Sequence, residues 1–239
     1  MFVIPMAGLS SRFFKAGYTQ PKYMLKARDE TLFAHAVNSF ADYFEQDRFL
    51  FVVRSDYDTP AFVAAEAERL GITDFELVVL DRETAGQAET VALALNGYSG
   101  EPLYIFNIDT FRPGYRKPSF CDLADGYLET FIGSGKNWSN IEPQQPGSDR
   151  VIRTAEKQEI SEYCCTGLYH WGSADLYRRY YDQYARLDKS QLDAGEQYVA
   201  PMYNLAIRDG CDIRFSVIER EEVIFCGTPD EYTAYLGEQ

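Results

Sequence analysis

The stretch "IPMAGLSSRF", Ile4 to Phe13, contains the turn on which the fold prediction rests. An apolar run from Met1 to Met6 ends there in a glycine, followed by two serines and an arginine. A plain strand-to-helix turn needs one glycine and one capping residue. This turn adds small residues that leave backbone N–H groups exposed, and a fixed positive charge, a combination that suits a phosphate chain. The sequence therefore predicts a buried first strand followed by a phosphate-binding loop.

Apolar patterns after this turn alternate between strands and helices. The predicted strands cover residues 2–6, 48–54, 75–80 and 103–108, and the predicted helices cover 31–43, 61–70 and 89–95. Strand–helix alternation at this spacing implies a parallel sheet with helices on both faces. The expected fold class is therefore α/β, with a Rossmann-like, mostly parallel sheet flanked by helices.

The second half of the chain is less regular. Strands are predicted over 127–132, 150–155, 165–171 and 212–218, and helices over 173–186, 198–208 and 230–236. The polar segment 133–148, rich in Gly, Ser, Asn, Gln and Pro, is predicted to be a loop or hairpin. No internal repeat or linker interrupts the chain, so residues 1–239 are expected to form a single domain with a β-rich lobe.

The charge and cysteine content exclude several classes of protein. A net charge of −14 and a pI of about 4.6 argue against a nucleic-acid partner or an anionic membrane surface, since both favour a basic protein. An anionic substrate would then need local cations or a divalent metal. The five cysteines are odd in number and form no CxxC motif, which indicates reduced thiols. No signal peptide or stretch of about 20 apolar residues occurs. We therefore expect a cytoplasmic protein without membrane insertion.

Two cations follow the first strand. Arg12 offers a planar fork that can bind phosphate oxygens in a bidentate manner. Ten residues later, Pro21-Lys22 places a second cation after the same long loop. Taken alone, a glycine and a basic residue favour an ordinary loop that carries two exposed charges. The whole string "PMAGLSSRF…QPKYML" is far more specific than either cation.

This string resembles the signature of nucleotide-sugar pyrophosphorylases, which are nucleotidyltransferases with a GT-A-like fold. Their pattern is roughly a strand, A-G-x-G-[ST]-R-[FLM], a short loop and P-K. Ser10 stands where glycine is usual; a serine fits if its backbone φ is negative, and its hydroxyl can add a contact. The resemblance implies that the loop and its arginine hold the β- and γ-phosphates of an NTP, and that Lys22 holds the α-phosphate or the incoming phosphate. The loop residues concerned are Ala7, Gly8, Ser10, Ser11 and Arg12.

The segment "TAGQAETV", Thr84 to Val91, follows the third strand and opens a helix. In isolation it reads as a helix N-terminus capped by Thr84. In the family, an element at this place lines the nucleobase pocket. The resemblance implies that the Gln87 amide contacts the base edge, with Gly86 and Ala88 beside the ring. An amide both donates and accepts hydrogen bonds, so Gln87 by itself does not distinguish cytosine from uracil. We expect CTP or UTP as the substrate in preference to dTTP.

The segment "YIFNIDTF" ends an apolar strand in Asn107-Ile108-Asp109. An aspartate at the end of a central strand is either a magnesium ligand or a cap of the next turn. Mg²⁺ is bound by one or two carboxylates together with phosphates and water. The family's strand ends in a similar N-x-D or G-D, which assigns the Mg²⁺ ligand to Asp109.

Three later strings extend the resemblance, and one of them departs from the family. "AEKQEIS" and "TGLYHW" resemble acceptor-binding elements, which implies acceptor contacts from Glu156, Lys157, Thr166 and Gly167. "IFCGTPDEY" resembles D-x-G-T-P-E. Many members place a second metal-binding aspartate two residues before that glycine, and here the position is Phe225.

The expected function is Mg²⁺-dependent nucleotidyl transfer. An NTP would be joined to a phosphorylated sugar or small phosphorylated metabolite with release of pyrophosphate. The segment "EQYVAPMYNLAIRDG", Glu196 to Gly210, resembles a helix in the capsule-biosynthesis members of the family, as the preceding segments resemble its acceptor-binding elements. These capsule-type segments suggest a product destined for a capsular or surface polysaccharide. About 1–112 would bind the nucleotide, and about 113–239 the acceptor. One alternative is a GT-A glycosyltransferase, but Asn107-Ile108-Asp109 supplies only half of the expected D-x-D. A catalytically inactive nucleotide-binding homologue is the other alternative, suggested by Phe225.

Overall fold

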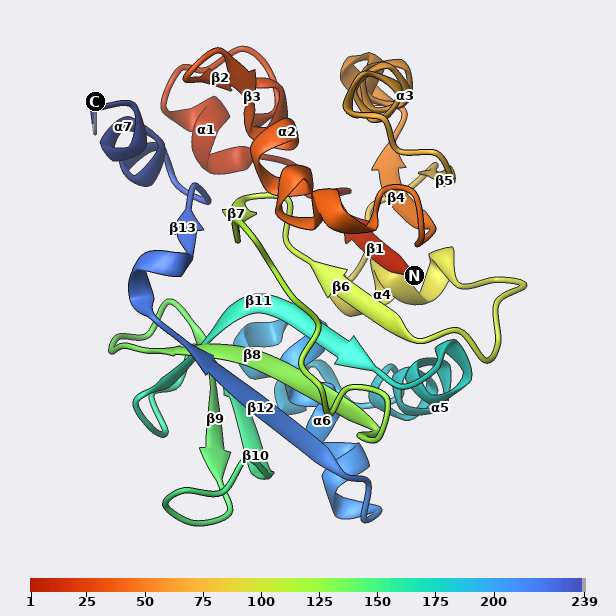
Figure 1. Cartoon of the computed structure of the whole chain (residues 1–239), viewed down its shortest axis with the longest axis vertical. Helices are drawn as coiled ribbons and strands as arrows, with labels where there is room; N and C mark the ends of the chain where they lie inside the picture. The colour runs from red at the N-terminus through yellow and green to blue at the C-terminus, as the bar shows by residue number, and fades with distance from the viewer. Residues whose placement is uncertain (238–239) are drawn as a thin grey trace. The chain divides into compact units, whose positions relative to one another are not determined.

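The computed structural model describes residues 1–237, and two compact units can be distinguished in it. The first unit contains Phe2–Glu83, Phe106–Arg116 and the residues from Glu221 onward. The second unit contains Met1, Thr84–Ile105 and Lys117–Arg220. Each unit is described by itself, with the element labels of Figure 1.

The first unit is built on three parallel strands. These are β1 (Phe2–Pro5), β4 (Phe49–Arg54) and β5 (Phe75–Leu80), in the order β1-β4-β5. Phe2 pairs with Phe49, and Phe49 pairs with Phe75, in parallel register. Phe49 to Val53 are all buried, as the continuous apolar run of a parallel strand covered on both faces requires. The predicted strands of this half are therefore confirmed.

The first unit also contains helices. The helices of the first unit are α1 (Ser11–Lys15), α2 (Leu32–Val37), α3 (Thr59–Leu70) and α7 (Pro229–Gly237), with 3-10 turns at Lys22–Met24, Asn38–Tyr43 and Asp56–Asp58. α3 packs against β4 and β5 (Figure 1). It ends at Gly71, whose φ of 81° suits a glycine at a helix C-terminus.

Two short antiparallel pairs complete the first unit. β2 (Lys26–Ala27) pairs with β3 (Glu30–Thr31), and β7 (Thr110–Phe111) pairs with β13 (Ile224–Phe225). Two-residue strands are too short to show a hydrophobic period, so they were not predicted from the sequence. The β7–β13 pair places a late segment of the chain beside the residues that directly follow Asp109.

The second unit is rich in strands. They are β6 (Leu103–Phe106), β8 (Gly126–Ile132), β9 (Ser139–Pro143), β10 (Val151–Glu156), β11 (Tyr163–Trp171) and β12 (Ile213–Ile218). The order is β10-β9-β11-β6, while β8 pairs with β11 and β12. β9 lies inside the segment predicted as a loop or hairpin, and it forms an antiparallel hairpin with β10. β6 lies on the unit boundary, because Phe106 belongs to the first unit.

Three helices belong to the second unit. They are α4 (Gln87–Ala94), α5 (Ala174–Tyr184) and α6 (Val199–Arg208), with 3-10 turns at Lys189–Gln191 and Asp193–Gly195 and a further one at the unit boundary, Arg220–Glu222. α6 packs on β10 and lies behind β8 and β12 in Figure 1. The Ser173 hydroxyl accepts from the Leu176 N–H at 3.1 Å and so caps the N-terminus of α5.

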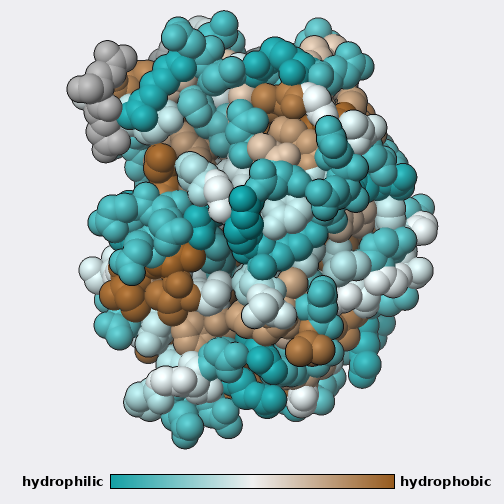
Figure 2. Space-filling view, in the orientation of Figure 1, coloured by the Kyte–Doolittle hydropathy of each residue, from teal (hydrophilic) through white to brown (hydrophobic). Residues whose placement is uncertain are grey.

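The α/β class with a largely parallel sheet flanked by helices is confirmed by these elements. The surface in Figure 2 is mostly hydrophilic, in keeping with the charged composition. An apolar patch lies over the converging ends of β8, β11 and β12, where Ile132 and Val217 are both 47% exposed (Figure 2). Within residues 1–237, no helix has the length and apolar character that a membrane span requires.

A buried histidine predicts the pH dependence of folding. His170 Nδ1 lies 2.9 Å from the Leu103 carbonyl oxygen and Nε2 lies 3.2 Å from that of Cys121. Burial lowers the pKa of His170 from 6.5 to about 4, although both carbonyls favour the charged ring. Between pH 6.5 and pH 4, His170 is therefore mostly protonated in the unfolded chain and mostly neutral in the folded protein. Stability should fall by up to about 3 kcal/mol as the pH drops from 6.5 to 4.

Urea unfolding at pH 7.5 and pH 5 measures this loss. The variant His170→Asn removes the titrating group and keeps a hydrogen-bond donor. Its free energy of unfolding should change less between the two pH values than that of the wild type. An equal change in both proteins would show that His170 does not cause the acid sensitivity.

Candidate functional site

The turn after β1 carries the first group of predicted residues. Ser10 is the N-cap of α1 and has a left-handed backbone, with φ at 51°. The condition given for a serine at this position, a negative φ, is not met: the turn keeps the left-handed backbone that glycine adopts easily, and Ser10 tolerates it. A left-handed residue with a Cβ costs about 1–2 kcal/mol. Ser11 and Arg12 are exposed, and a Cβ at Gly8 would meet no atom within 4 Å, so the loop is open to solvent.

The Ser10 hydroxyl ties this turn to the second cation. Its oxygen accepts a hydrogen bond from the Lys22 backbone N–H at 3.2 Å. Lys22 is the first residue of the 3-10 turn Lys22–Met24, so the bond fixes the backbone from which its side chain extends. The hydroxyl contact expected at Ser10 is thus present within the protein.

Two substitutions at Ser10 separate its backbone strain from its hydrogen bond. Ser10→Ala keeps the strain and loses the bond, so turnover should fall about 5- to 10-fold, the equivalent of about 1–1.5 kcal/mol. Ser10→Gly should lose turnover to the same extent but unfold at a higher denaturant concentration than Ser10→Ala, because it relieves the left-handed strain. Steady-state kinetics and urea unfolding measure the two effects. Full activity in both variants would show that the bond to Lys22 has no part in turnover.

Lys22 and Asp109 form an ion pair within the first unit. Nζ of Lys22 lies 2.5 Å from Oδ2 of Asp109, and the two side chains are 20% and 23% exposed. Burial by itself would raise the pKa of Asp109, but the charge and hydrogen bond of Lys22, with a further contribution from Arg12, lower it. The Asp109 carboxylate is therefore charged at neutral pH, and three predicted site residues act on one another electrostatically.

The G-T-P segment borders the same carboxylate. The Cys226 N–H donates to the Asp109 carbonyl at 2.8 Å, next to the pairing of Phe225 with Thr110. A Cβ built on Gly227 would lie 2.9 Å from Asp109 Oδ2 and 3.6 Å from Glu231 Oε2. Any side chain at position 227 would therefore clash with the Asp109 carboxylate, and glycine avoids this clash. Sequence reasoning recognised this segment but missed the role of its glycine.

Glu231 has a structural explanation. Its Oε2 accepts from the Thr228 N–H at 2.9 Å, and its own N–H donates to the Thr228 hydroxyl at 3.2 Å. This reciprocal pair is a capping box at the start of α7. Among residues 1–237, no three His, Cys, Asp or Glu side chains form a cluster that could hold a metal. Asp109 is the carboxylate that could hold Mg²⁺ here, because it is charged and is not covered by a side chain at position 227, and phosphates and water commonly complete such a site.

The segment Thr84–Ala88 lies in the second unit. α4 begins at Gln87, and its N-cap is Gly86 without a side-chain cap, so the interpretation of Thr84 as the cap is wrong. Gly86 has a φ of 151°, and a Cβ there would lie 2.5 Å from the Gln197 carbonyl oxygen. The Ala88 N–H donates to that oxygen at 2.8 Å. Glycine at position 86 is thus required by the close approach of Gln197.

Glu156 ends β10 as a buried carboxyl group. Burial raises its pKa, and the nearby charges of Asp193 and Glu196 add to the increase, against the Ser139 hydroxyl and Lys157. The Ser139 hydroxyl donates to Glu156 Oε2, and the Glu156 N–H donates to Asp193 Oδ2 at 2.9 Å.

Lys157 follows with a left-handed backbone, at a φ of 55°. Its Nζ donates to the Tyr198 hydroxyl at 2.5 Å. Burial by itself would lower the pKa of Lys157, but Tyr198 and the charges of Glu156 and Glu196 raise it. Lys157 therefore stays a cation, in a backbone conformation that is uncommon for lysine.

One segment joins these predicted elements. Gln197 pairs with the Gly86 turn, because its N–H donates to the Ala85 carbonyl at 2.9 Å. The adjacent Tyr198 binds Lys157, and Asp193 binds the Glu156 backbone. Sequence reasoning missed residues 193–198 as a link, since nothing in their pattern shows which residues they will meet. The one feature that could have drawn attention to this segment is its acidic and aromatic side chains just before a predicted helix.

Thr166 and Gly167 lie in a bulged part of β11 and are both buried. The Thr166 hydroxyl donates to Glu129 Oε1 at 3.2 Å, and Gly167 has a φ of 96°. The glycine is explained by this bulge, since a positive φ favours glycine. An acceptor contact from either residue stays a prediction.

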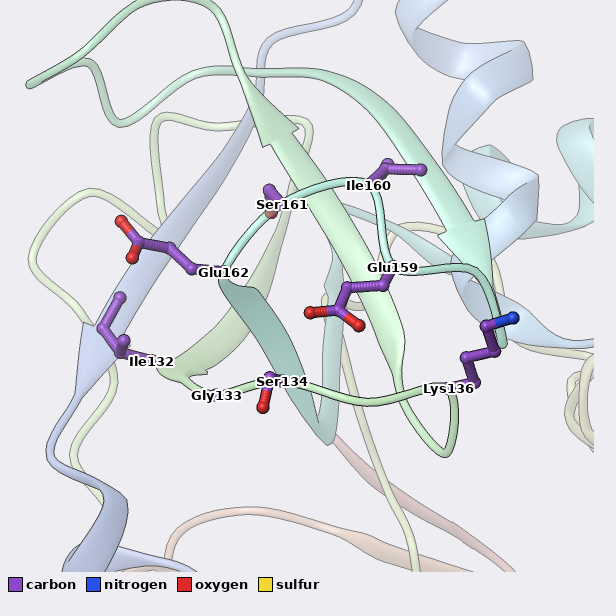
Figure 3. Close-up of a pocket in the computed structure, with 8 residues that line it drawn as sticks. All are labelled: Ile132, Gly133, Ser134, Lys136, Glu159, Ile160, Ser161 and Glu162. Carbon is purple, nitrogen blue, oxygen red and sulfur yellow. The ribbon is translucent and has the colours of Figure 1, made fainter.

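A separate hollow of about 820 Å³ opens in the second unit. Figure 3 shows the Glu159 carboxylate inside it and the Lys136 amino group pointing outward. Glu159 Oε2 accepts from the Gly135 N–H at 3.2 Å and so links the two loops that form the hollow. The lining residues are Ile132, Gly133, Ser134, Lys136, Glu159, Ile160, Ser161 and Glu162. None of the predicted site residues lines it.

The whole chain is similar to a solved bacterial structure. The nucleoside-diphosphate-sugar pyrophosphorylase from Vibrio cholerae RC9 is 52% identical, with a TM-score of 0.96 and coverage of 100% of both chains. The chain belongs to the nucleoside-diphosphate-sugar pyrophosphorylase family. The resemblance that the first turn suggested is therefore confirmed.

More distant structures share the pyrophosphorylase fold. The inositol-1-phosphate CTP transferase from T. maritima is 14% identical, with a TM-score of 0.73 over 98% of this chain and 92% of that one. A UDP-glucose pyrophosphorylase complexed with UDP-glucose is 13% identical, with a TM-score of 0.74 over 99% and 96%. A scan of protein-family models and a search of curated proteins found no match.

Membership in the pyrophosphorylase family makes the chain an enzyme of the nucleotidyltransferase type. Within its first unit, the structure brings together Ser10, Lys22 and Asp109, with the charge of Arg12 acting on Asp109. Within its second unit, the Gly86–Ala88 turn and the Glu156–Lys157 pair meet the segment 193–198. The predicted residues therefore form one group in each unit.

Proposed function

We propose that this enzyme transfers a nucleotidyl group from CTP or UTP to a phosphorylated sugar or small phosphorylated metabolite, with Mg²⁺, and releases pyrophosphate. The observation that carries the proposal is the ion pair of Lys22 with Asp109, with Arg12 and the Ser10-bound backbone beside it. This group combines flexible and planar cations with a charged carboxylate, which are the residue types that a metal–triphosphate requires.

In the proposed reaction, an oxygen of the acceptor phosphate forms a bond to the α-phosphorus of the NTP. The bond from that phosphorus to the bridging oxygen breaks, and pyrophosphate leaves with its electron pair. The acceptor is already ionised, so no protein nucleophile is needed. Catalysis then consists of positioning and charge stabilisation. Arg12 neutralises the leaving pyrophosphate, and Lys22 orients the attacking phosphate and the α-phosphate.

Asp109 would hold the divalent ion, which supplies positive charge to the phosphate oxygens when bound. The carboxylate stays ionised because Lys22 and Arg12 lower its pKa, and Gly227 leaves space beside Oδ2. A local cation of this kind also explains how a protein of net charge −14 binds anionic substrates. Phe225 contributes no carboxylate, so we propose that Asp109 serves with phosphates and water alone.

The second unit would bind the nucleobase and the acceptor. We propose that Gln87, with Gly86 and Ala88, contacts the base. Lys157 would bind the acceptor phosphate, since its raised pKa keeps it cationic, and Glu156 would accept hydrogen bonds from acceptor hydroxyls. Thr166 and Gly167 would shape the acceptor site from behind, because both are buried.

The setting of the reaction is a further part of the proposal. We propose a cytoplasmic enzyme that supplies an activated precursor for a capsular or surface polysaccharide. All five cysteines are free, as expected in a reducing compartment. The capsule-type segments found in the sequence support this destination.

Pyrophosphate release is the test. The wild-type protein with Mg²⁺ is assayed with each NTP against a panel of phosphorylated sugars and small metabolites. Turnover with one pair, greatest for CTP or UTP, is the expected result. Pyrophosphate release that survives both Arg12→Ala and Lys22→Ala would contradict the assignment. NTP binding without turnover by any pair would favour the inactive homologue that Phe225 suggests.

A further inference from the structure

Lys22 and a divalent ion would compete for the same carboxylate oxygen. Lys22 Nζ lies 2.5 Å from Asp109 Oδ2, the oxygen that a Cβ at Gly227 would approach to 2.9 Å. A divalent ion coordinates a carboxylate oxygen at about 2.1 Å. An ammonium group at hydrogen-bond distance from that oxygen would then stand within about 5 Å of a doubly charged ion, where the two repel each other strongly. Tight metal binding at Asp109 therefore requires the Lys22 amino group to move away from Oδ2.

The structure also shows how Lys22 can leave without rearranging the loop. Its backbone N–H is held by the Ser10 hydroxyl at 3.2 Å, so the start of the 3-10 turn stays in place. The side chain has four flexible carbons, and its charge can move several ångströms about a fixed Cα. Both side chains of the pair are about one-fifth exposed, so exchange needs no opening of the core.

We propose that Lys22 is a built-in competitor of the metal, which makes metal binding conditional on nucleotide. This inference rests on the proposed function, in which Lys22 moves to a phosphate and Asp109 holds Mg²⁺. The triphosphate offers Lys22 a more negative partner than one carboxylate. As Lys22 turns to the phosphates, Oδ2 becomes available to the ion that the triphosphate carries. Nucleotide and metal thus bind with positive coupling, which is commonly 5- to 150-fold in proteins.

The consequence is that removing a cation should improve metal binding in the protein without nucleotide. The probe is Mn²⁺ alone, with free Mn²⁺ followed by electron paramagnetic resonance. Lys22→Met is expected to bind Mn²⁺ about 10- to 100-fold more tightly than the wild type. Lys15→Met, an exposed lysine of α1, makes the same change of net charge and is the matched control, with affinity within about 2-fold of the wild type.

A third variant separates this inference from the function on which it rests. Asp109→Asn in the Lys22→Met background should return Mn²⁺ affinity to the wild-type value or below it. If Lys22→Met binds Mn²⁺ no more tightly than the wild type while Asp109→Asn still weakens binding, the competition is wrong and the metal site stands. If Asp109→Asn has no effect in either background, the proposed metal site itself is wrong. Lys22→Gln serves as a second neutral variant, with thermal melting to check the fold of each.

Discussion

Replacing Lys22 with alanine is expected to lower kcat about 100- to 1000-fold. Lys22 is proposed to stabilise charge on the phosphate oxygens of the transition state, and removal of one such preorganised group costs about 3–4 kcal/mol. Arg12→Ala should show a loss of similar size, because it removes the cation that is proposed to neutralise the leaving pyrophosphate. Pyrophosphate release under saturating substrates measures both losses.

The fold should survive both substitutions. Arg12 is exposed, and the Lys22–Asp109 pair is partly exposed to solvent, so its loss costs about 1 kcal/mol or less. Lys15→Ala removes a cation from the same short helix and serves as the control, with kcat close to the wild type. A drop in kcat for Lys15→Ala as large as that for Arg12→Ala would mean that general charge, and not phosphate contact, explains the effect.

Gly86→Ala is expected to have the largest effect on stability. The φ of 151° and ψ of −176° at Gly86 belong to a region that only glycine enters at low cost, and other residues lose about 1–3 kcal/mol there. The added Cβ would also lie 2.5 to 2.8 Å from three backbone atoms of Gln197. Together these terms should reduce the free energy of unfolding by about 3 kcal/mol or more, within the range of severe single substitutions.

The loss should extend to activity at temperatures where the variant remains folded. Moving Gln197 away breaks its two backbone bonds to Ala85 and Ala88, and it disturbs the neighbouring Tyr198 that binds Lys157. Gly100→Ala is the control, because a Cβ at Gly100 meets nothing within 4 Å. Urea unfolding and acceptor KM are measured for both. A Gly86→Ala protein as stable as Gly100→Ala would contradict the close approach of Gln197.

The parts of the fold that sequence predicted are those encoded by local periodicity. The buried run Phe49–Val53 identifies a central parallel strand, because only a strand covered on both faces is apolar throughout. Arg12 and Asp109 were predicted for a related reason: each follows a strand, and ligands bind at the carboxyl ends of parallel strands. β9 was not resolved as a strand, because Ser139, Asn140 and Glu142 make its sequence as polar as a loop.

The remainder depends on contacts between residues far apart in the chain. Nothing local to Gly227 shows that its missing side chain leaves room beside Asp109, and nothing local to Gln197 shows that it pairs with Gly86. The φ of Ser10 could not be predicted from the sequence, because side-chain type alone does not determine which backbone region a turn requires. The family resemblance therefore predicted roles for the site residues, and the structure shows which other residues they contact.

The first unit is closed by a segment that follows the second unit in the chain. β13 pairs with β7, and the Tyr232 hydroxyl of α7 donates to the Lys26 carbonyl at 2.7 Å. During translation, residues 84–220 are synthesised before β13 and α7. The first unit therefore lacks these two elements while the second unit is being synthesised. Such non-local pairing slows folding and exposes apolar surface to chaperones. Asp109 therefore meets Gly227 only after residues 117–220 have been translated, and a nascent chain that stops before Gly227 would carry the Lys22–Asp109 pair without the β13 segment that borders it.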